Sequence, residues 1–292
     1  MTKIQVNSQG KAYLTTAGKA LVSVQPTLVT KSITENGTYN ASSDNADGYS
    51  SVTVNVSGGG GSTKYGCTID NLLGNVDANG KLQLPTEQMD LVFTGVVDIA
   101  NYGLYYKFYK AGVKSVSFPD LTTISGNSSC YDTFTGCTSL TSVSFPNLTT
   151  ISNFYGCYYM FTGCSSLTSV LFPNLTTISG MYACSGMFSN CANLTSVSFP
   201  SLTTISGSYC CSEMFFFSRA ISDIYFNALT TTSFGTNTDQ FSSMLSSTGT
   251  NVIHTVHFPS NLTSTISGLS GYPLFGGTSG YVTLAFDLPA TT

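Results

Sequence analysis

Cysteine offers the widest chemistry in this 292-residue chain, because a thiol can form a disulfide, bind a metal or act as a nucleophile. Seven of the nine cysteines fall into two columns with a spacing of 27 residues. The columns are Cys130, Cys157, Cys184 and Cys211, and Cys137, Cys164 and Cys191. No Cys-x-x-Cys pair occurs, which argues against a structural zinc site. The regular spacing indicates thiols that share one structural environment.

Disulfides between column mates are the alternative to free thiols. If 27 residues form one coil of a stack, column mates lie about 4.8 Å apart, a separation that a disulfide can bridge by Cα distance alone. Their Cβ atoms would then point in parallel, which disfavours the bond. We therefore expect free, buried thiols that fill the core.

The two histidines, His254 and His257, lie in an alternating segment that is typical of a strand. Their odd separation places them on opposite faces, so we expect two surface residues and no metal pair. The chain contains no phosphate-binding Gly-x-x-x-x-Gly-Lys loop, no Gly-x-Ser-x-Gly elbow and no His-Glu-x-x-His pair. We expect no catalytic residue, no metal and no cofactor. An enzymatic alternative is confined to residues 64–111, where no pairing of residues suggests a reaction.

Tyrosine, serine and glycine concentrate in a stretch that recurs before each Met-Phe or Thr-Phe pair. Its four copies differ from one another, whereas the apolar columns around them recur. Unconstrained solvated positions should accumulate Lys, Glu and Gln, but Tyr with Ser and Gly is typical of binding loops. We therefore predict a ligand-binding edge formed by Tyr131, Asp132, Phe154, Tyr155, Tyr158, Tyr159, Met181, Tyr182, Tyr209 and Glu213.

Two other interpretations of the polar surface remain open. The aromatic side chains of this edge could instead pack on one another along the stack and form a satellite core. The opposite surface is a further candidate, because small hydroxyls there make a flat polar strip suited to sugars. Its residues are Ser117, Ser144, Ser198, Tyr225 and His257.

The elements that position these residues follow from a repeat. A Val-x-Phe segment followed by proline recurs at 27-residue intervals, and a further copy comes after 32 residues. The segments begin at Val116, Val143, Val170, Val197, Ile224 and Val256, the Ile224 copy lacking the proline. A unit of this length cannot bury its own apolar face and must stack on its neighbours, so the repeat predicts a solenoid.

One unit predicts an α/β coil. In the copy from Leu140 to Cys164, the Val143-x-Phe145 alternation indicates a short strand with both large side chains inward, and the following proline ends the pairing. Cys157, Phe161 and Cys164 stand at i, i+4 and i+7, the spacing of one face of a helix. Each coil is therefore expected to contain a strand, a turn, a second extended stretch and a short helix, with the strands aligned in one parallel sheet.

The charge pattern limits the partners. Charged residues make up 8% of the chain, the net charge is −4, and no Lys, Arg, Asp or Glu occurs from Thr133 to Ser212. The chain lacks the basic cluster that binds phosphate backbones, so nucleic acid is not expected as a partner. Polar residues interrupt every apolar run before the roughly 20 residues that a membrane span needs. The first ten residues contain no apolar run of a secretory signal, so we expect no ordinary signal peptide.

The run Met160-Phe-Thr-Gly-Cys164-Ser-Ser-Leu-Thr-Ser-Val170-Leu-Phe-Pro-Asn-Leu-Thr-Thr-Ile178 resembles the leucine-rich repeats of BspA-like bacterial surface proteins. The unit of that family reads Phe-x-x-Cys-x-x-Leu-x-x-Val-x-Phe/Leu-Pro. The resemblance covers about residues 112–290 and departs from the family by several extra residues before each Met-Phe pair. It implies a right-handed, non-catalytic solenoid used for adhesion or binding.

A second resemblance covers residues 31–56. Lys31-Ser-Ile-Thr-Glu-Asn-Gly-Thr-Tyr-Asn40 and Asp47-Gly-Tyr-Ser-Ser-Val-Thr-Val-Asn-Val56 are similar to a small module of bacteriophage tail and fibre proteins. The residues themselves indicate β structure, because Asn36-Gly37 is a hairpin turn signal and Val52, Val54 and Val56 alternate on one face of a strand. Any other small β-module of a surface protein is the alternative.

The chain divides into five predicted parts. They are an N-terminal docking segment (1–30), a small β-module (31–57), a Gly/Ser linker (58–63), an N-terminal cap of the solenoid (64–111), and the leucine-rich repeat solenoid (112–292). Residues 281–286 alternate like a last strand that closes the stack.

These features predict a bacteriophage virion protein of tail-fibre, collar or head-fibre type. Residues 1–57 would contact other virion proteins, and the solenoid would bind a bacterial surface protein or polysaccharide. A BspA-like adhesin, located on the bacterial surface or secreted, is the alternative, and an inert spacer is the third. A fibre protein would imply a homotrimer, although no heptad pattern specifies one.

Overall fold

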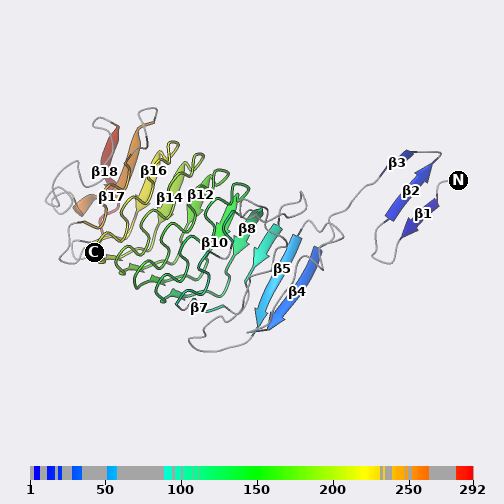
Figure 1. Ribbon diagram of the computed structural model, residues 1–292. Coiled ribbons are helices and arrows are strands. Elements are labelled where there is room, and N and C mark those ends of the chain that lie inside the picture. The colour runs from blue at the N-terminus through cyan, green and yellow to red at the C-terminus, as the bar shows by residue number, and fades with distance from the viewer. Residues whose placement is uncertain are drawn as a thin grey trace.

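The computed structural model covers all 292 residues and describes part of them. Backbone alone is described for the strand residues 3–6, 12–16, 19–21, 28–34, 51–57 and 89–92. Backbone and side chains are described for 93, 96–99, 101–106, 108–110, 112–230, 233, 239–246, 248, 252–262 and 281–291. The stacked coils of a solenoid occupy most of this second set (Figure 1).

The Val-x-Phe segments form the first face of the solenoid, which we call the strand face. Its strands are β6 (Met89–Val92), β8 (Val113–Ser117), β10 (Ser142–Ser144), β12 (Ser169–Leu171), β14 (Ser196–Phe199), β16 (Asp223–Phe226), β17 (His254–Pro259) and β18 (Val282–Leu288). All pair in parallel and the repeats are in register, so that Val143 lies beside Val116 and Val197 beside Ile224. The predicted alignment is therefore confirmed. It is divided between two sheets, β10-β8-β6 and β12-β14-β16-β17-β18, and not contained in one.

A second face consists of two-residue strands with the sequence Thr-Ile, preceded by one Asp-Ile strand. These strands are β7 (Asp98–Ile99), β9 (Thr123–Ile124), β11 (Thr150–Ile151), β13 (Thr177–Ile178) and β15 (Thr204–Ile205). They pair in parallel in the order β15-β13-β11-β9-β7, and every isoleucine is buried. This face corresponds to the second extended stretch predicted for each coil.

The third face contradicts the predicted short helix. We call it the turn face, and in the first five coils it comprises the described residues within 101–110, 127–137, 154–164, 181–191 and 208–218. Its backbone N–H groups alternate between two acceptors. Cys130 donates to Gly156 O of the next coil at 2.7 Å, whereas Tyr131 donates to Ser128 O of its own turn at 3.3 Å. An α-helix would satisfy both within the segment, so the turn face is a ladder of turns between coils.

Left-handed backbone conformations divide the turn face into units of four residues. Positive φ angles recur at every fourth position, as at Ser128 (49°), Asp132 (50°) and Gly136 (74°). Phe161 and Cys157 are both buried because the turn unit, like a helical turn, repeats after about four residues. The i, i+4 spacing was therefore observed correctly but assigned to the wrong element. The helical structure among the described residues is the single 3₁₀ turn η1 (Ser260–Leu262).

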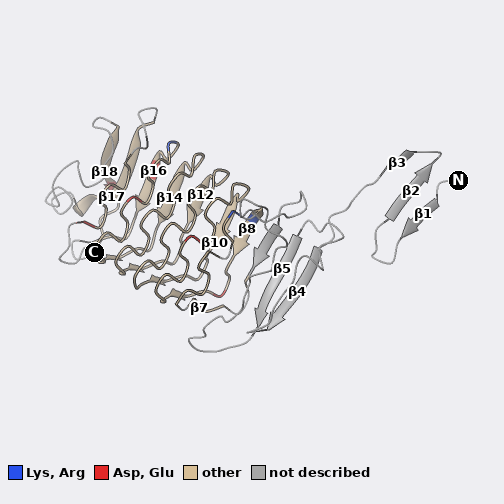
Figure 2. Cartoon of the chain, in the orientation of Figure 1, with Lys and Arg blue, Asp and Glu red and all other residues tan. Residues whose placement is uncertain are grey.

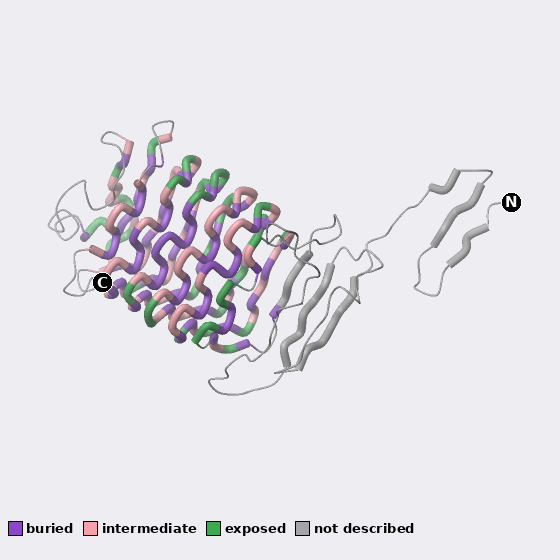
Figure 3. The backbone as a smooth tube through the Cα atoms, in the orientation of Figure 1, coloured by how far each residue is buried: buried purple, intermediate pink, exposed green. Residues whose placement is uncertain are grey.

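Phenylalanine ladders fill the space between the faces. Behind the strand face, rings such as Phe118, Phe145 and Phe172 stack with centroids 5.3 and 5.8 Å apart. The second of these contacts bridges the interruption between β10 and β12. A parallel ladder runs behind the turn face from Phe108 to Phe215, with centroids 5.1 to 5.9 Å apart. Buried residues accordingly form one continuous band inside the coils (Figure 3).

The eight described cysteines are free and buried, which confirms the preferred interpretation of the columns; Cys67 lies outside the described residues. In the second column each thiol donates to a carbonyl one coil earlier, as Cys164 does to Phe134 O at 3.2 Å. Ser218 continues this column and donates to Phe188 O at 2.6 Å. Burial raises the pKa of the Cys191 thiol to about 12.

Hydroxyl and amide side chains link the coils on the outside. The Thr149 hydroxyl donates to Thr122 O at 2.9 Å, and Thr176 donates to Thr149 O at 3.0 Å. Asn147 and Asn174 each donate to the carbonyl of the proline one coil earlier, at 2.6 Å. These ladders give the surface polar groups with fixed partners. The central coils carry almost no charge (Figure 2).

The ladders extend N-terminally of the predicted solenoid boundary at residue 112. β6 and β7 pair with the first strands of their faces, and Tyr106 N donates to Tyr131 O at 3.0 Å. The described residues between 89 and 110 therefore stack as a coil of the solenoid. Residues 64–88 lie outside the described residues, so the cap assigned to 64–111 stays a prediction there.

The N-terminal strands form two small sheets. β1 (Lys3–Val6), β2 (Ala12–Thr16) and β3 (Lys19–Leu21) are antiparallel. β4 (Leu28–Thr34) pairs in parallel with β5 (Ser51–Ser57), which contains the predicted strand. A parallel pair cannot be closed by a two-residue hairpin, and the Asn36-Gly37 signal itself lies outside the described residues. At the other end β18 is the edge strand beyond β17, as predicted for the last strand.

Candidate binding surface

Tyrosines of five consecutive coils meet on the turn face. We call this set the tyrosine strip. It comprises Tyr102, Tyr105, Tyr106, Tyr131, Tyr155, Tyr158, Tyr159, Tyr182 and Tyr209. Tyr155, Tyr182 and Tyr209 occupy the same left-handed position of successive coils, with φ angles of 55°, 54° and 53°. The turn ladder therefore places one ring above the next.

The rings of the strip pack against one another from coil to coil. Tyr155 and Tyr182 are parallel to within 4° with centroids 5.4 Å apart, and Tyr182 and Tyr209 are 5.2 Å apart at 9°. Tyr131 lies 4.9 Å from Tyr158 and 5.2 Å from Tyr105. This is the packing that the satellite-core interpretation predicts.

The strip is nevertheless open to solvent. Tyr102, Tyr105 and Tyr106 are 61%, 39% and 41% exposed, and the other rings are partly exposed. Beside the strip, Phe154 is 51% and Met181 39% exposed. The nine aromatic rings thus form an ordered surface as well as a packed one. Their contact with a ligand stays a prediction.

The two carboxylates predicted for the site have partners within the strip. Asp132 is 8% exposed and accepts a hydrogen bond from the Thr135 hydroxyl at 2.5 Å. Burial, together with a hydrogen bond to the Asp132 carboxylate, raises the pKa of Tyr106. Glu213 accepts a hydrogen bond from the Tyr159 hydroxyl at 3.3 Å. Both acids therefore support the rings as well as bordering the surface.

Tyr159 reaches Glu213 by crossing an entire coil. The residue between them in the column is Gly186, whose φ is +62°. A Cβ atom on Gly186 would lie 1.9 Å from Cε1 of Tyr159, so the ring occupies the space that a side chain would need. The missing side chain lets one tyrosine bridge two coils.

The sequence prediction brought together the ten residues that lie on this surface but missed its most exposed end. Tyr102, Tyr105 and Tyr106 were assigned to the cap, where the Val-x-Phe repeat was not recognised. A usable signal existed, because Tyr102-Gly-Leu-Tyr-Tyr-Lys-Phe108 repeats the pattern of Tyr155-Gly-Cys-Tyr-Tyr-Met-Phe161. The turn-face pattern extends one coil further than the strand pattern that defined the boundary.

Comparison with known families also places the start of the repeat region before residue 112. Residues 104–246 match the model of the BspA type leucine-rich repeat region in six copies. This part of the chain is therefore similar to a BspA type leucine-rich repeat region. Solenoids of this kind are typically non-catalytic binding scaffolds. No curated protein and no solved structure matches the chain.

The strand face of the leucine-rich repeat solenoid is the other candidate surface. Ser144 is exposed there, but Leu171, which is 53% exposed, interrupts the row of hydroxyls. Towards the C-terminal end, Tyr225 stacks on His257 with centroids 4.4 Å apart. The strand face is therefore less uniformly polar than the sequence indicated.

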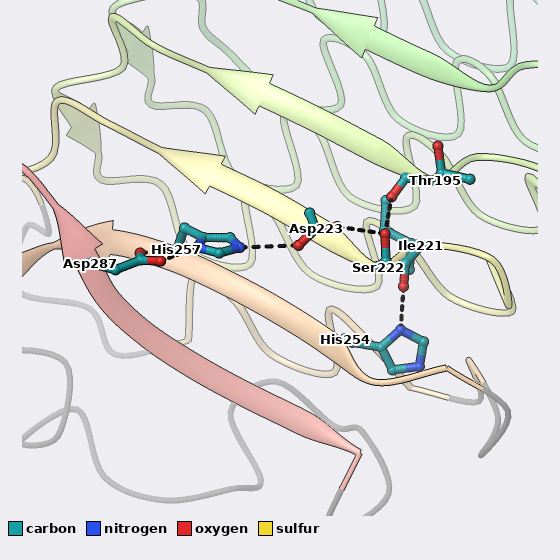
Figure 4. A network of polar contacts seen from close by, with 7 residues as sticks. All are labelled: Thr195, Ile221, Ser222, Asp223, His254, His257 and Asp287. Atoms are coloured by element: carbon teal, nitrogen blue, oxygen red, sulfur yellow. Dashed lines mark hydrogen bonds and ion pairs between the residues drawn. The ribbon is translucent and has the colours of Figure 1, made fainter.

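A polar network fastens the last three strands of this face together (Figure 4). His257 on β17 contacts Asp223 of β16 through Nε2 at 3.1 Å and Asp287 of β18 through Nδ1 at 2.9 Å. His254 lies on the opposite side of β17 and is buried at 1% exposure, with Nδ1 against Ile221 O. The predicted opposite faces are confirmed, but the prediction of two surface histidines is wrong for His254.

Among the residues that the structure describes, no group of three or more His, Cys, Asp or Glu side chains is arranged so that it could hold a metal ion. Within the same residues, no helix has the length and apolar character to cross a membrane. The tyrosine strip is therefore the surface on which a functional hypothesis can be built.

Proposed function

We propose that the chain is a non-catalytic binding protein that recognises a bacterial surface structure through the tyrosine strip. The observation that carries this proposal is the unbroken row of partly exposed rings over five coils. Tyrosine combines a large apolar contact area with a polar hydroxyl. Rings that are already held by their neighbours lose little freedom on binding, which favours affinity.

Separate observations support two kinds of protein that could display such a surface. The resemblance of residues 31–56 to phage tail modules supports a virion protein of tail-fibre, collar or head-fibre type, with residues 1–57 contacting other virion proteins. The BspA-type repeat region supports an adhesin displayed on, or secreted from, a bacterial cell. We favour the virion protein, because the adhesin leaves the N-terminal module without a role.

Binding of the purified full-length chain to intact bacterial cells tests the proposed function. The double variant Tyr102→Ala/Tyr105→Ala removes two of the most exposed rings. We expect saturable binding by the native chain to at least one strain of a panel, and at least about tenfold weaker binding by the variant. The single variant Tyr102→Ala, which should also bind more weakly, should keep a thermal midpoint close to that of the native chain, because Tyr102 is 61% exposed. The double variant should lose somewhat more stability, because Tyr105 is 39% exposed and packs on Tyr106 and Tyr131.

Leu171→Ala is the matched control, since Leu171 is equally exposed but lies on the strand face. It should bind like the native chain. Equal loss in both variants would remove the tyrosine strip from the proposal. Absence of saturable binding to every strain would instead favour the inert spacer.

Locating the protein distinguishes a virion protein from an adhesin. Mass spectrometry of purified phage particles should detect the chain as a stoichiometric component if it is a virion protein. Labelling of intact bacteria with a membrane-impermeant reagent should detect it if it is an adhesin. Detection only on bacteria would contradict the assignment as a virion protein, but it would not bear on the proposal that the tyrosine strip binds a ligand.

A further inference from the structure

The electrostatic character of the tyrosine strip restricts its ligand. No Lys or Arg occurs from residue 115 to residue 218, which includes the turn-face segments of four of the five coils. An anionic polymer would therefore find no cation to neutralise it there. The two carboxylates accept hydrogen bonds from Thr135 and Tyr159 and are not grouped into an acidic patch. The strip suits an uncharged ligand.

The backbone of the turn face excludes peptide binding by strand addition. Extended peptides bind by adding a strand to unpaired N–H and C=O groups. On the turn face these groups are used between coils and within turns, as with Tyr155 N to Met181 O at 3.1 Å and Tyr158 N to Tyr155 O at 3.3 Å. Recognition on this face must therefore come from side chains.

The available side-chain groups are phenol hydroxyls and ring edges. Burial is the main cause that raises the pKa of Tyr131, Tyr158 and Tyr182, so these hydroxyls remain protonated and can both donate and accept. The faces of Tyr155, Tyr182 and Tyr209 are covered by one another, which leaves their edges outward. The most exposed rings are Tyr102, Tyr105 and Tyr106, at the N-terminal end of the strip, and Tyr102 is the most open at 61%.

The arrangement also sets a direction. The rings form two overlapping columns, Tyr105, Tyr131 and Tyr158 and then Tyr155, Tyr182 and Tyr209, with successive centroids 4.9 to 5.4 Å apart. A linear ligand that lies along the axis therefore meets at least one phenol group in every coil. A polymer of uncharged sugars fits this pattern, because each unit repeats the same hydroxyls and offers an apolar ring face for the open tyrosines at one end.

We infer that the ligand of the tyrosine strip is an uncharged glycan chain that lies along the solenoid axis, with its end against Tyr102, Tyr105 and Tyr106. This inference rests on the proposed function and specifies its ligand. A polypeptide receptor is the competing class. The two classes differ in what they require from the tyrosines, since a polyol needs the hydroxyls whereas an apolar protein surface needs only the rings.

The first test removes single hydroxyls. Tyr182→Phe keeps the ring between Tyr155 and Tyr209 and deletes one phenol group, so the fold is preserved. We expect about fivefold weaker binding to the strain that binds the native chain, the loss of one hydrogen bond. Tyr281→Phe is the matched control, because it also deletes one phenol group but lies at the C-terminal end, outside the turn face; it should change binding by less than about twofold. Unchanged binding by Tyr182→Phe would overturn the inference that the ligand is a glycan.

The second test treats the cells. Periodate, which cleaves vicinal diols of sugars, should abolish binding of the native chain, whereas protease treatment and 1 M NaCl should leave it unchanged. Affinity electrophoresis in gels that contain dextran, mannan or polygalacturonate should show retardation by a neutral polysaccharide and none by the anionic one. Loss of binding after protease, with resistance to periodate, would overturn the glycan while the proposed function stands. Native chain that binds no untreated cells would overturn the proposed function itself.

Discussion

At the scale of single residues, the coils are matched by what each side chain gives to the coil beside it. Gly186 gives space, which the ring of Tyr159 fills on its way to Glu213. Cys164 and Cys191 give a donor to a carbonyl of the preceding coil, and Ser218 does the same with a hydroxyl. Substitutions at these positions should be judged by the neighbouring coil and not by the residue alone.

Replacement of Gly186 by alanine should destabilise the fold through Tyr159. The left-handed backbone costs about 1–2 kcal/mol for any residue with a Cβ, and the overlap with the ring adds to it. Gly163→Ala is the matched control, because its φ is +72° but its nearest neighbour would lie at 3.7 Å. We expect the free energy of unfolding, measured in urea, to fall more for Gly186→Ala than for Gly163→Ala. In a Tyr159→Ala background the two losses should become similar; a difference that persists would contradict this account.

The thiol of Cys191 should be replaceable by a hydroxyl but not by a methyl group. Cys191→Ser keeps a donor to Phe161 O, in the way that Ser218 donates to Phe188 O. Cys191→Ala removes the donor and leaves a small cavity, which costs about 1–3 kcal/mol. Urea unfolding should rank the serine variant above the alanine variant. The opposite order would show that the thiol acts only as apolar filler.

At the scale of elements, the turn face is the part of each coil that departs from a regular strand. Its left-handed residues every fourth position stop an α-helix from forming and leave half of the N–H groups free to bond to the next coil. The tyrosines at these positions are thereby brought into line along the axis. The proposed binding surface is thus a consequence of the turn ladder.

Substitution of Asn190 distinguishes a turn ladder from a helix. Asn190 is exposed and has a φ of 55°. In a helix, alanine would be more stable than glycine by about 1 kcal/mol. At a left-handed position the order reverses, because glycine has no Cβ penalty. We expect the thermal midpoint of Asn190→Gly to exceed that of Asn190→Ala, and the helical order would contradict the turn ladder.

At the scale of the whole molecule, the solenoid is one core that extends through all the described coils. The phenylalanine ladders and the thiol columns lie in the same interior. Most hydrogen bonds between coils join direct neighbours, and the contact of Tyr159 with Glu213 is one that spans two coils. Stability should therefore be shared between coils and their interfaces. It should also depend on conditions that act on many repeats at once.

Alkaline pH is such a condition. Burial raises the pKa of Cys164 and Cys191, and a hydrogen bond with the neighbouring Cys210 thiol, together with burial, raises that of Cys211. A thiol whose pKa is raised in the folded state contributes stability that is complete below its unfolded pKa, about 8.5, and is lost as the pH rises towards the folded value. The free energy of unfolding should fall from about pH 8.5 to 11.

The measurement is urea unfolding across this pH range, compared with the Cys191→Ser variant. The variant should lose less stability over the range, because serine does not ionise there. Identical pH profiles would remove the Cys191 thiol as a cause of the decline. In the folded protein the described thiols should also be unreactive towards a thiol reagent until urea unfolds the chain.

Much of the fold could be predicted from particular residues. The 27-residue recurrence of Val143 and Phe145 was enough to predict parallel strands in register, since the sheet needs only that equivalent residues face the same way. The Cys164 column indicated buried thiols for the same reason. The ten site residues were placed on one surface because residues at equal repeat positions must lie side by side.

The sequence by itself determined the repeat, its register, the free thiols and the surface on which the tyrosines gather, because all of these follow from stacking identical units. Only the tertiary structure decided that the turn face is not helical, because two secondary structures share a four-residue spacing and the hydrogen bonds that separate them run between coils. It also decided that the solenoid extends N-terminally of residue 112, because the backbone N–H groups of Tyr102 and Tyr106 bond to carbonyl groups of the next coil. Bonds between coils have no counterpart within a single unit of sequence.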